Sequence, residues 1–410
     1  MASPMTVEQA KASVRRLEEI CAIRPTVANL INLANCYFIL GDLEAALPII
    51  ETAFQKDPHN IIVAVNMGIM WRDFGNHEGA DKIFEMAYKE LDPDDQLAKL
   101  GYSESLLRRG RWEEAWPIYN SCRASKEEVA VEAGIPLHVK EWDGKKTVRK
   151  LAVIDEGGIG DSITYSRYLH KLTELGIDWV YLPFPELRGF YERASWIGQR
   201  RLVTTGVNMN VSHWTTTQSL PGNLNSTPST VPGYPEPFKA LSEFVRKHKM
   251  GQMKTKPVLG LVWSGAELRN GGRKIHSMTE GQAMRLVCKT DHLVDWVNLQ
   301  HDVIRMPEPV INRKFSSWEE LAGLIVSMDA VVSVETGPMC MAHALGKELL
   351  IVLSANSDWK FLESGESPFY PGARIFRNSG VGGGIEKAID QTIEHILSQY
   401  DEKKRIKLVG

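Results

Sequence analysis

The stretch LAVIDEGGIGDSITY, residues 151–165, decides the fold of the larger part of this 410-residue chain. The apolar run LAVID has the length and composition of a short buried strand, and a helical pattern follows it. Gly157, Gly158 and Gly160 lie between the two and leave the backbone without side chains. With the apolar run at 178–184, the order becomes strand, glycine turn, helix, strand. This order predicts a βαβ unit and a parallel sheet.

A second unit of the same kind follows a stretch rich in Pro, Ser, Thr and Asn at 213–238, which we expect to form a long loop. We expect strands at 257–265, 294–300, 329–334 and 348–354, helices at 316–328 and 339–347, and a closing amphipathic helix at 385–400. Two successive α/β units are therefore predicted after residue 150.

The first third of the chain repeats with a period of 34 residues. The equivalent pairs are Gly41 and Gly75, Ala46 and Ala80, and Ala53 and Ala87. A third copy around Gly110 comes one residue late, because Pro93 lies one place beyond the position that Pro58 predicts, and a partial copy ends near Pro25. This period and pattern resemble the tetratricopeptide repeat, a pair of antiparallel helices.

The last repeat carries the aromatic residues Trp112, Trp116 and Tyr119 at helical spacing. This stripe could bind a ligand, but the spacing is more typical of a docking face or a core. Because three repeats are barely enough for an independent solenoid, we expect them to pack against the rest of the chain.

Composition places the chain among ordinary multidomain globular proteins, with 43% hydrophobic and 24% charged residues. The formal net charge of -3 does not favour nucleic-acid binding through bulk charge. Five scattered cysteines without a CxxC pair indicate a reducing compartment and neither a disulfide framework nor a zinc site. With no apolar segment long enough to span a membrane, we expect a cytoplasmic protein.

Two glycine turns are candidates for anion binding. A strand that ends in glycines before a helix exposes N–H groups at the positive end of the helix dipole, which suits a phosphate. The first turn contains Gly158 and Gly160, and the second is Glu335-Thr336-Gly337. The dinucleotide fingerprint GxGxxG is only partly met, because Ile163 takes the place of the third glycine. A nicotinamide-dependent oxidoreductase is therefore the weakest alternative.

A series of short segments in fixed order carries a more specific resemblance. The segments are GGIGDSITYSRYL, SLP (219–221), GLVWSG, GRKIHSM, VNLQ, SVETG, HALGK and SDWKFLESGESPFYPGARIFRN. Together they resemble the tetratricopeptide-repeat proteins whose C-terminal part is similar to the ADP-heptose:lipopolysaccharide heptosyltransferases. The resemblance covers the repeats and nearly all of 150–378. It implies a GT-B fold, in which two Rossmann-like halves face a cleft, and a class of glycosyltransferase that needs neither a cofactor nor a metal for catalysis.

The resemblance also implies roles for particular residues. Asp161 matches the aspartate taken as general base, which would accept the proton of the attacking acceptor hydroxyl. The alternative is that Asp161 only caps its helix. Arg273 and Lys274, with Arg269, match a basic stretch that would stabilise the leaving diphosphate, and His276 falls where an arginine is common. An ordinary solvated basic loop is the alternative for this stretch.

The second turn departs from the family pattern at two positions. Thr336 and Gly337 match the donor-binding turn, but Glu335 stands where that turn has aspartate. Cys340 takes the place of a histidine, and His343 lies one turn further on. Both departures put the identity of the donor, and activity itself, in question.

Further candidates lie at the ends of strands. Trp263, Ser264 and Gly265 follow one strand, and Trp263 could stack on a base or a sugar or form a wall of the cleft. Asp358 and Trp359 follow another and could line the donor pocket. The acidic run at 92–95 occupies a repeat turn and is expected to be solvated. No spacing of carboxylates or histidines suggests a metal-ligand set.

We therefore predict TPR-like helical repeats at 1–125, a linker at 126–150, an acceptor-side Rossmann-like half at 151–250, a donor-side half at 256–378 and a closing helix at 385–400. The predicted function is an inverting, metal-independent glycosyltransferase that uses a nucleotide sugar and an unknown acceptor hydroxyl. The repeats would recruit the acceptor or a protein partner. The alternative from another class is a catalytically inactive GT-B-like scaffold.

Overall fold

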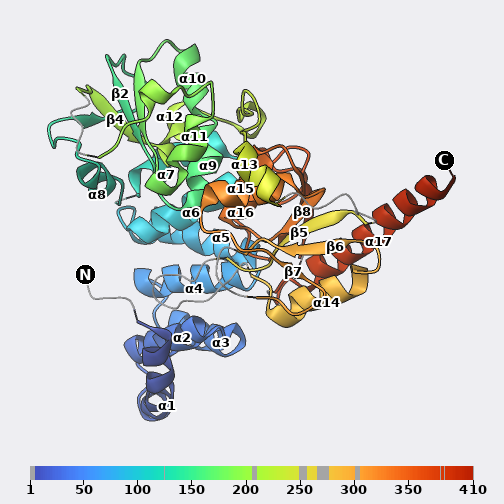
Figure 1. Cartoon of the computed structure of the whole chain (residues 1–410). Helices are drawn as coiled ribbons and strands as arrows, with labels where there is room; N and C mark the ends of the chain where they lie inside the picture. The colour runs from blue at the N-terminus through green and yellow to red at the C-terminus, as the bar shows by residue number, and fades with distance from the viewer. Residues whose placement is uncertain are drawn as a thin grey trace.

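The chain folds into a helical array followed by two parallel α/β units (Figure 1). The computed structural model describes residues 5–123, 125–205, 210–248, 256–265, 277–300, 305–378, 380–382 and 384–409, without the side chains of 125 and 402–409. The array and the two sheets confirm the predicted fold class, helical repeats followed by two Rossmann-like halves.

The array consists of one helix and three antiparallel hairpins. These elements are α1 (Val7–Ile23), α2 (Val27–Leu40) with α3 (Leu43–Lys56), α4 (Ile61–Asp73) with α5 (His77–Met86), and α6 (Gln96–Arg108) with α7 (Trp112–Ser121). Each hairpin turns on a glycine with positive φ: 84° at Gly41, 87° at Gly75 and 75° at Gly110. Other residues adopt this left-handed conformation at a cost, which explains why glycine recurs at the repeat period.

The extra residue between the second and third repeats has a structural counterpart. Helix α5 continues into a π-helical turn, η1 (Ala87–Leu91), whose hydrogen bonds span one residue more than those of an α-helix. The additional residue is absorbed in this turn before Pro93, so the third hairpin can still stack on the second.

Phe84 joins the second and third repeats. A Cβ atom on Gly68 would lie 2.8 Å from Phe84 Cζ, and one on Gly101 would overlap the same ring. Phe84 is 1% exposed, so the two glycines make the space that its ring fills. Gly68, Gly101 and Phe84 together form the contact between the second and third repeats.

The first sheet has the strand order β1-β4-β2-β3, and all of its pairings are parallel. The strands are β1 (Lys140–Glu141), β2 (Leu151–Ile154), β3 (Trp179–Leu182) and β4 (His213–Thr216). Helix α9 (Ile159–Ser166) follows β2 directly, as predicted, and α10 (Leu169–Glu174) continues it.

Two parts of this sheet differ from the sequence-based expectation. Strand β4, one of the two central strands, lies in the stretch expected to be a loop. The expectation was wrong because its threonines make the sequence polar, although the strand is buried; Thr215 and Thr216 are fully buried. The segment expected to be a linker supplies α8 (Ser125–Glu132) and the edge strand β1. A two-residue strand is too short to give a periodic signal.

The second sheet has six parallel strands in the order β10-β9-β8-β5-β6-β7. They are β5 (Val258–Val262), β6 (Asp295–Asn298), β7 (Ile311–Asn312), β8 (Ala330–Ser333), β9 (Glu348–Leu353) and β10 (Arg374–Arg377). One face packs on α14 (Glu280–Thr290) and α17 (Glu386–Val409). The other packs on α15 (Trp318–Val326) and α16 (Gly337–Ala344), and α13 (Ser242–His248) contacts α15.

Short helical turns complete the chain. They are η2 (Pro185–Leu187), α11 (Arg188–Glu192), η3 (Gln199–Arg201), η4 (Thr217–Ser219), α12 (Leu220–Asn223), η5 (Pro228–Thr230) and η6 (Trp359–Phe361). Of the helices described here, none combines the length and the apolarity needed to cross a membrane.

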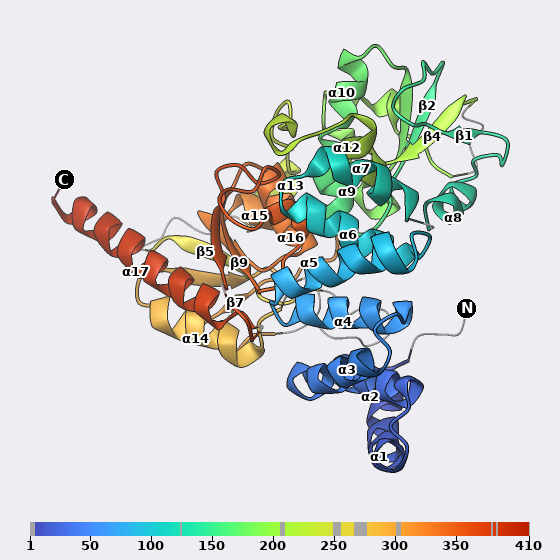
Figure 2. The same cartoon turned by 180° about the vertical axis from the view of Figure 1, so that it is seen from behind.

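The inner repeats dock on the second α/β unit through aromatic rings. Trp359 is 5% exposed, and its ring centroid lies 5.5 Å from that of Trp112, 5.7 Å from that of Trp116 and 6.0 Å from that of Tyr119. The predicted docking face is thus confirmed, and one apolar cluster extends from the inner repeats into both α/β units. Figure 2 shows α1–α3 at the far end of the array from the sheets.

We predict that Phe84→Ala destabilises the fold by about 3–5 kcal/mol, because it leaves a cavity between two glycine-lined surfaces that cannot collapse onto each other. Urea unfolding followed by tryptophan fluorescence measures the change. Leu97→Ala on α6 is the control, since Leu97 is 55% exposed and its loss should cost about 0.5 kcal/mol or less. An equal, small effect of both variants would contradict the packing role.

Candidate functional site

The two glycine turns meet where α9 of the first α/β unit and α16 of the second begin. A Cβ atom on Gly160, in α9, would lie 3.2 Å from Cys340 Sγ and 3.3 Å from Gly337 Cα, in α16. Only small residues allow this approach of two helix N-termini from opposite halves. We call this contact between the starts of α9 and α16 the junction. Both helix dipoles are positive at this end, so the junction combines two positive potentials. It is a suitable place for negative charge.

Asp161 lies at this junction and interacts with groups from both halves of the molecule. One carboxylate oxygen accepts from the backbone N–H of Gly158 at 3.2 Å, and the other accepts from the ammonium group of Lys360 at 3.3 Å. Its side chain keeps 30% of its surface exposed. Asp161 therefore caps its helix, as the alternative interpretation held, and also faces the second half of the molecule.

Lys360 is the cation of the junction, and we did not single it out in the sequence. Its side chain is 8% exposed and bridges Asp161 with Asp358, whose carboxylate lies 2.7 Å from the ammonium nitrogen. Burial alone would lower the pKa of Lys360, but the charge of Asp358, together with that of Asp161, raises it well above its usual value. Lys360 therefore stays protonated and links the two halves.

A buried carboxylate, that of Asp155, fixes the strand that precedes the first turn. Asp155 accepts hydrogen bonds from Ser162 Oγ at 2.6 Å, Tyr181 OH at 2.7 Å and the backbone N–H of Phe184 at 2.8 Å. Burial raises the pKa of Asp155 to about 6, and these hydrogen bonds partly offset the rise. Because all its contacts are internal, Asp155 positions the turn and does not face the junction.

The repeats also reach the first turn. Arg123, just after α7, lies 3.3 Å from the carboxylate of Glu156 and donates to Thr216 Oγ1 at 3.2 Å. Both charged side chains are less than 8% exposed. Arg123 therefore connects the end of the helical array to the turn that presents Asp161.

The second turn presents backbone N–H groups. Helix α16 begins at Gly337 without a side-chain cap, and Pro338 at its second position has no N–H to satisfy. Gly265 lies beside this turn, since a Cβ atom on it would be 3.9 Å from Thr336 Cγ2. The structure thus brings Gly265, Thr336 and Gly337 together at the carboxyl edge of the second sheet, opposite Gly158 and Gly160.

The two departures from the family pattern have structural explanations. Cys340 is 6% exposed and packs against Gly160, so the small side chain lets the helix starts touch. His343 does not replace the missing imidazole at the turn, because its ring packs edge-on against Tyr370 with centroids 5.3 Å apart. Glu335 accepts from the backbone N–H of Asp358 at 3.2 Å and so ties the second turn to the segment that carries Lys360.

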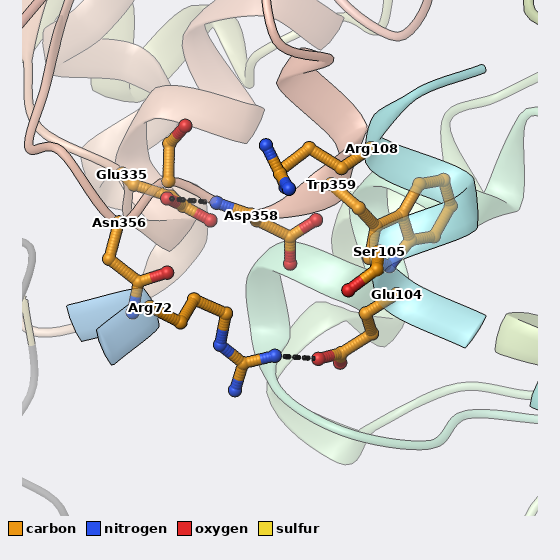
Figure 3. A pocket seen from close by; sticks show the side chains of 9 residues that line it. Arg72, Glu104, Ser105, Arg108, Glu335, Asn356, Asp358 and Trp359 are labelled. Carbon is orange, nitrogen blue, oxygen red and sulfur yellow. Dashed lines mark hydrogen bonds and ion pairs between the residues drawn. The ribbon is translucent and has the colours of Figure 1, made fainter. Parts of the chain in front are cut away.

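A polar pocket of about 170 Å³ lies beside the junction, between the repeats and the second sheet (Figure 3). The sheet side includes Glu335 and Asp358, both candidates from the sequence, and the repeat side includes Arg72, Glu104 and Arg108. Sequence reasoning missed the repeat residues. Arg72 lies three residues before Gly75 and Arg108 two residues before Gly110, so these arginines do not recur at the repeat period, and nothing in the sequence showed that the two turns face the sheet.

The remaining candidates have three different outcomes. Trp263 and Ser264 are 7% and 2% exposed, and Trp263 belongs to the core under α14, which places its ring away from the junction. Trp359 lines the pocket, but its ring packs among the repeat aromatics. Arg269, Arg273, Lys274 and His276 lie outside the described residues, so their predicted role stays a prediction.

In the described ranges, no group of three or more His, Cys, Asp and Glu residues is arranged to hold a metal ion. Cys21, Cys36, Cys122, Cys288 and Cys340 are all free thiols.

The chain matches no sequence model of a protein family, and no curated protein matches it. A structure of MamA MSR-1 matches 28% of this chain, in the N-terminal part, with 21% identity and a TM-score of 0.25; the match spans 65% of that chain, slightly under two thirds of its length. ADP-heptose lps heptosyltransferase II of E. coli matches 62% of this chain and 99% of its own, with 11% identity and a TM-score of 0.42.

A glycosyl transferase family 9 protein from Veillonella parvula DSM 2008 matches 56% of this chain and 86% of its own, with 12% identity and a TM-score of 0.40. The resemblances indicated by the sequence thus recur among solved structures. At these TM-scores they carry neither an activity nor a ligand over to this chain.

We predict that Lys360→Met destabilises the protein by about 3–5 kcal/mol, because it leaves two carboxylates without their shared cation. Chemical denaturation measures the loss. The control is Lys171→Met, which removes an exposed ion pair with Glu174 and should cost about 1 kcal/mol or less. If both variants behave alike, Lys360 does not join the halves.

His343 should make stability depend on pH. Burial lowers its pKa to about 4, with the Arg167 charge acting in the same direction. The unfolded chain therefore binds this proton more readily, and the stability from neutral His343 is complete above about pH 6.5 and is lost as the pH falls toward 4. Relative to His343→Gln, the wild type should lose about 2 kcal/mol between pH 7 and 5. A constant difference across this range would contradict the assignment.

Proposed function

We propose that the chain is a glycosyltransferase that moves a sugar from a nucleotide-sugar donor to an acceptor hydroxyl with inversion at the anomeric carbon. The observation that carries this proposal is the junction itself. Two closely packed helix starts from opposite α/β halves meet beside one partly exposed carboxylate and one buried ammonium group. The donor would bind on the second half and the acceptor on the first.

The helix starts and the cations would serve the leaving diphosphate. Its oxygens gain negative charge as the bond to the sugar breaks, and preorganised N–H groups and cations stabilise such charge. The N–H groups at Thr336 and Gly337 and the ammonium of Lys360 are the described groups suited to this task. Arg273 and Lys274 are further candidates from the sequence. No metal ion is part of the proposed reaction.

Asp161 would act as the general base. The acceptor oxygen forms its bond to the anomeric carbon, the bond from that carbon to the diphosphate oxygen breaks, and the acceptor proton passes to the Asp161 carboxylate. The electron pair of the broken bond leaves with the nucleoside diphosphate. The exposed part of Asp161 supports this role, because a base must reach its substrate.

A second candidate function, an inactive scaffold, is favoured by one specific observation. Each described cation near the junction already has carboxylate partners: Lys360 binds Asp161 and Asp358, Arg108 binds Asp81 and Glu363, and Arg72 binds Glu104. In a transferase, a bound diphosphate would have to compete for some of these cations. In a scaffold, the ion pairs would only hold the three parts together.

The helical repeats would help to bring the acceptor or a protein partner to the site. Five free cysteines are in keeping with the cytoplasm, where we expect the reaction to occur.

A panel of nucleotide sugars separates the two functions. A donor at a hundred times its dissociation constant should add about 2.7 kcal/mol of stability, which a thermal shift detects. Release of nucleoside diphosphate in the presence of candidate acceptors then reports transfer. If no nucleotide sugar or nucleoside diphosphate shifts the melting temperature, the transferase proposal fails and the scaffold is favoured.

Asp161→Asn is the sharpest variant for the proposed function. We expect it to lower kcat by about 10²–10⁴-fold, because the amide cannot accept the acceptor proton, while its oxygen can still cap α9. Donor affinity, measured by calorimetry, should change little. Asp143→Asn, at an exposed turn, is the matched control. Loss of folding together with donor binding would instead make Asp161 a structural cap.

A further inference from the structure

The pocket beside the junction has a wall that belongs to the helical repeats. Arg72 on α4 donates to Glu104 on α6 at 2.5 Å, and Glu335 and Asp358 form the opposite side (Figure 3). Trp359 and Ser105 also line it. The pocket therefore exists only where the second and third repeats stand against the second sheet.

The repeat wall is held firmly in place. Arg108 forms two hydrogen bonds to Asp81, at 2.7 and 2.8 Å, and a third to Glu363 at 2.7 Å. At the turn of the second repeat, Asn356 donates to Asp73 at 2.5 Å and His77 Nε2 contacts the carbonyl of Ala355 at 2.8 Å. These polar contacts between the repeats and the second unit make the pocket a preformed site.

The charges of the pocket argue against an anionic ligand. Three carboxylates, those of Glu104, Glu335 and Asp358, line it together with two guanidinium groups, those of Arg72 and Arg108. Each guanidinium already has a carboxylate partner. A phosphate here would meet three carboxylates and two guanidinium groups that already have carboxylate partners, so the phosphates of a donor belong at the helix starts.

Uncharged hydroxyl groups suit this lining better. A hydroxyl can donate to a carboxylate and accept from a guanidinium or amide N–H, so a polyol satisfies both kinds of group at once. The volume of about 170 Å³ is below the roughly 300–1,000 Å³ typical of pockets for drug-sized ligands, so one small ring fits and a complete nucleotide sugar does not.

We propose that this pocket holds the uncharged sugar ring of the donor and that the helical repeats, through Glu104 and Arg72, form one wall of that sugar site. This inference rests on the proposed transferase function and gives the repeats a second role besides recruitment. Asp358 lines the pocket and also binds Lys360, which binds Asp161. A ring in the pocket would therefore have its anomeric end toward the junction and its hydroxyls toward the repeats.

The test compares binding of a nucleotide hexose with binding of its nucleoside diphosphate, by calorimetry on the full chain. Nucleotides carrying glucose, N-acetylglucosamine or glucuronate are the probes. In the wild type, the neutral hexoses should bind at least about tenfold more tightly than the glucuronate donor. Glu104→Gln should weaken the nucleotide hexose by about tenfold or more and change the nucleoside diphosphate by less than about twofold. Glu78→Gln, an exposed glutamate of the same array, should change neither.

A variant that fills the pocket tests the same site independently of the ion pair between Arg72 and Glu104. Ser357→Tyr places a bulky side chain in the pocket from the sheet side and should likewise weaken only the nucleotide hexose. If both variants leave the ratio of the two affinities unchanged while the hexose donor still binds, the sugar lies elsewhere and this inference is wrong, although the proposed function survives. If neither ligand binds the wild type, the proposed function fails with it.

Discussion

The docking of Trp359 against the inner repeats determines the arrangement of the rest of the molecule. Trp112 and Trp116 surround this ring on the repeat side, and Phe369 packs on it from within the second unit. Burying several large aromatic rings together contributes far more to stability than any exposed ion pair. The repeats consequently form part of the α/β body, and their inner turns line a pocket that a separate recruitment module could not form.

The junction combines features with opposite energetic consequences. The close approach of two helix starts requires glycine at positions 160 and 337 and a small thiol at 340. The positive potential of these starts is balanced by Asp161 and Asp358, the carboxylate pair around Lys360. Buried ion pairs are costly to desolvate and add little net stability. Their presence at this position is easier to explain if the site stabilises charge on a ligand than if the contact is purely structural.

The sequence allowed most of the architecture to be predicted but only part of the site. Period and turn glycines identified the hairpins, and apolar runs identified β2, β3, β5, β6, β8 and β9. Strand β4 was not predicted, because its buried threonines give it a polar sequence. Asp161 could be singled out from its glycine turn and the family resemblance, and Thr336 and Asp358 from their positions after strands at the carboxyl edge of a sheet. Lys360, Arg72 and Glu104 could not, because their importance depends on contacts between segments that are distant in the sequence, which no local pattern encodes.

The continuous apolar cluster has a consequence for how such a chain can change in evolution. The third hairpin is embedded in the body, whereas α1–α3 project from it (Figures 1 and 2). A repeat inserted between the second and third hairpins would separate Arg72 from Glu104 and open the pocket, but one added next to α1 would meet only other repeats. Variation in the length of the array is therefore tolerated at the outer end alone, where it could alter the reach of the protein without disturbing its chemistry.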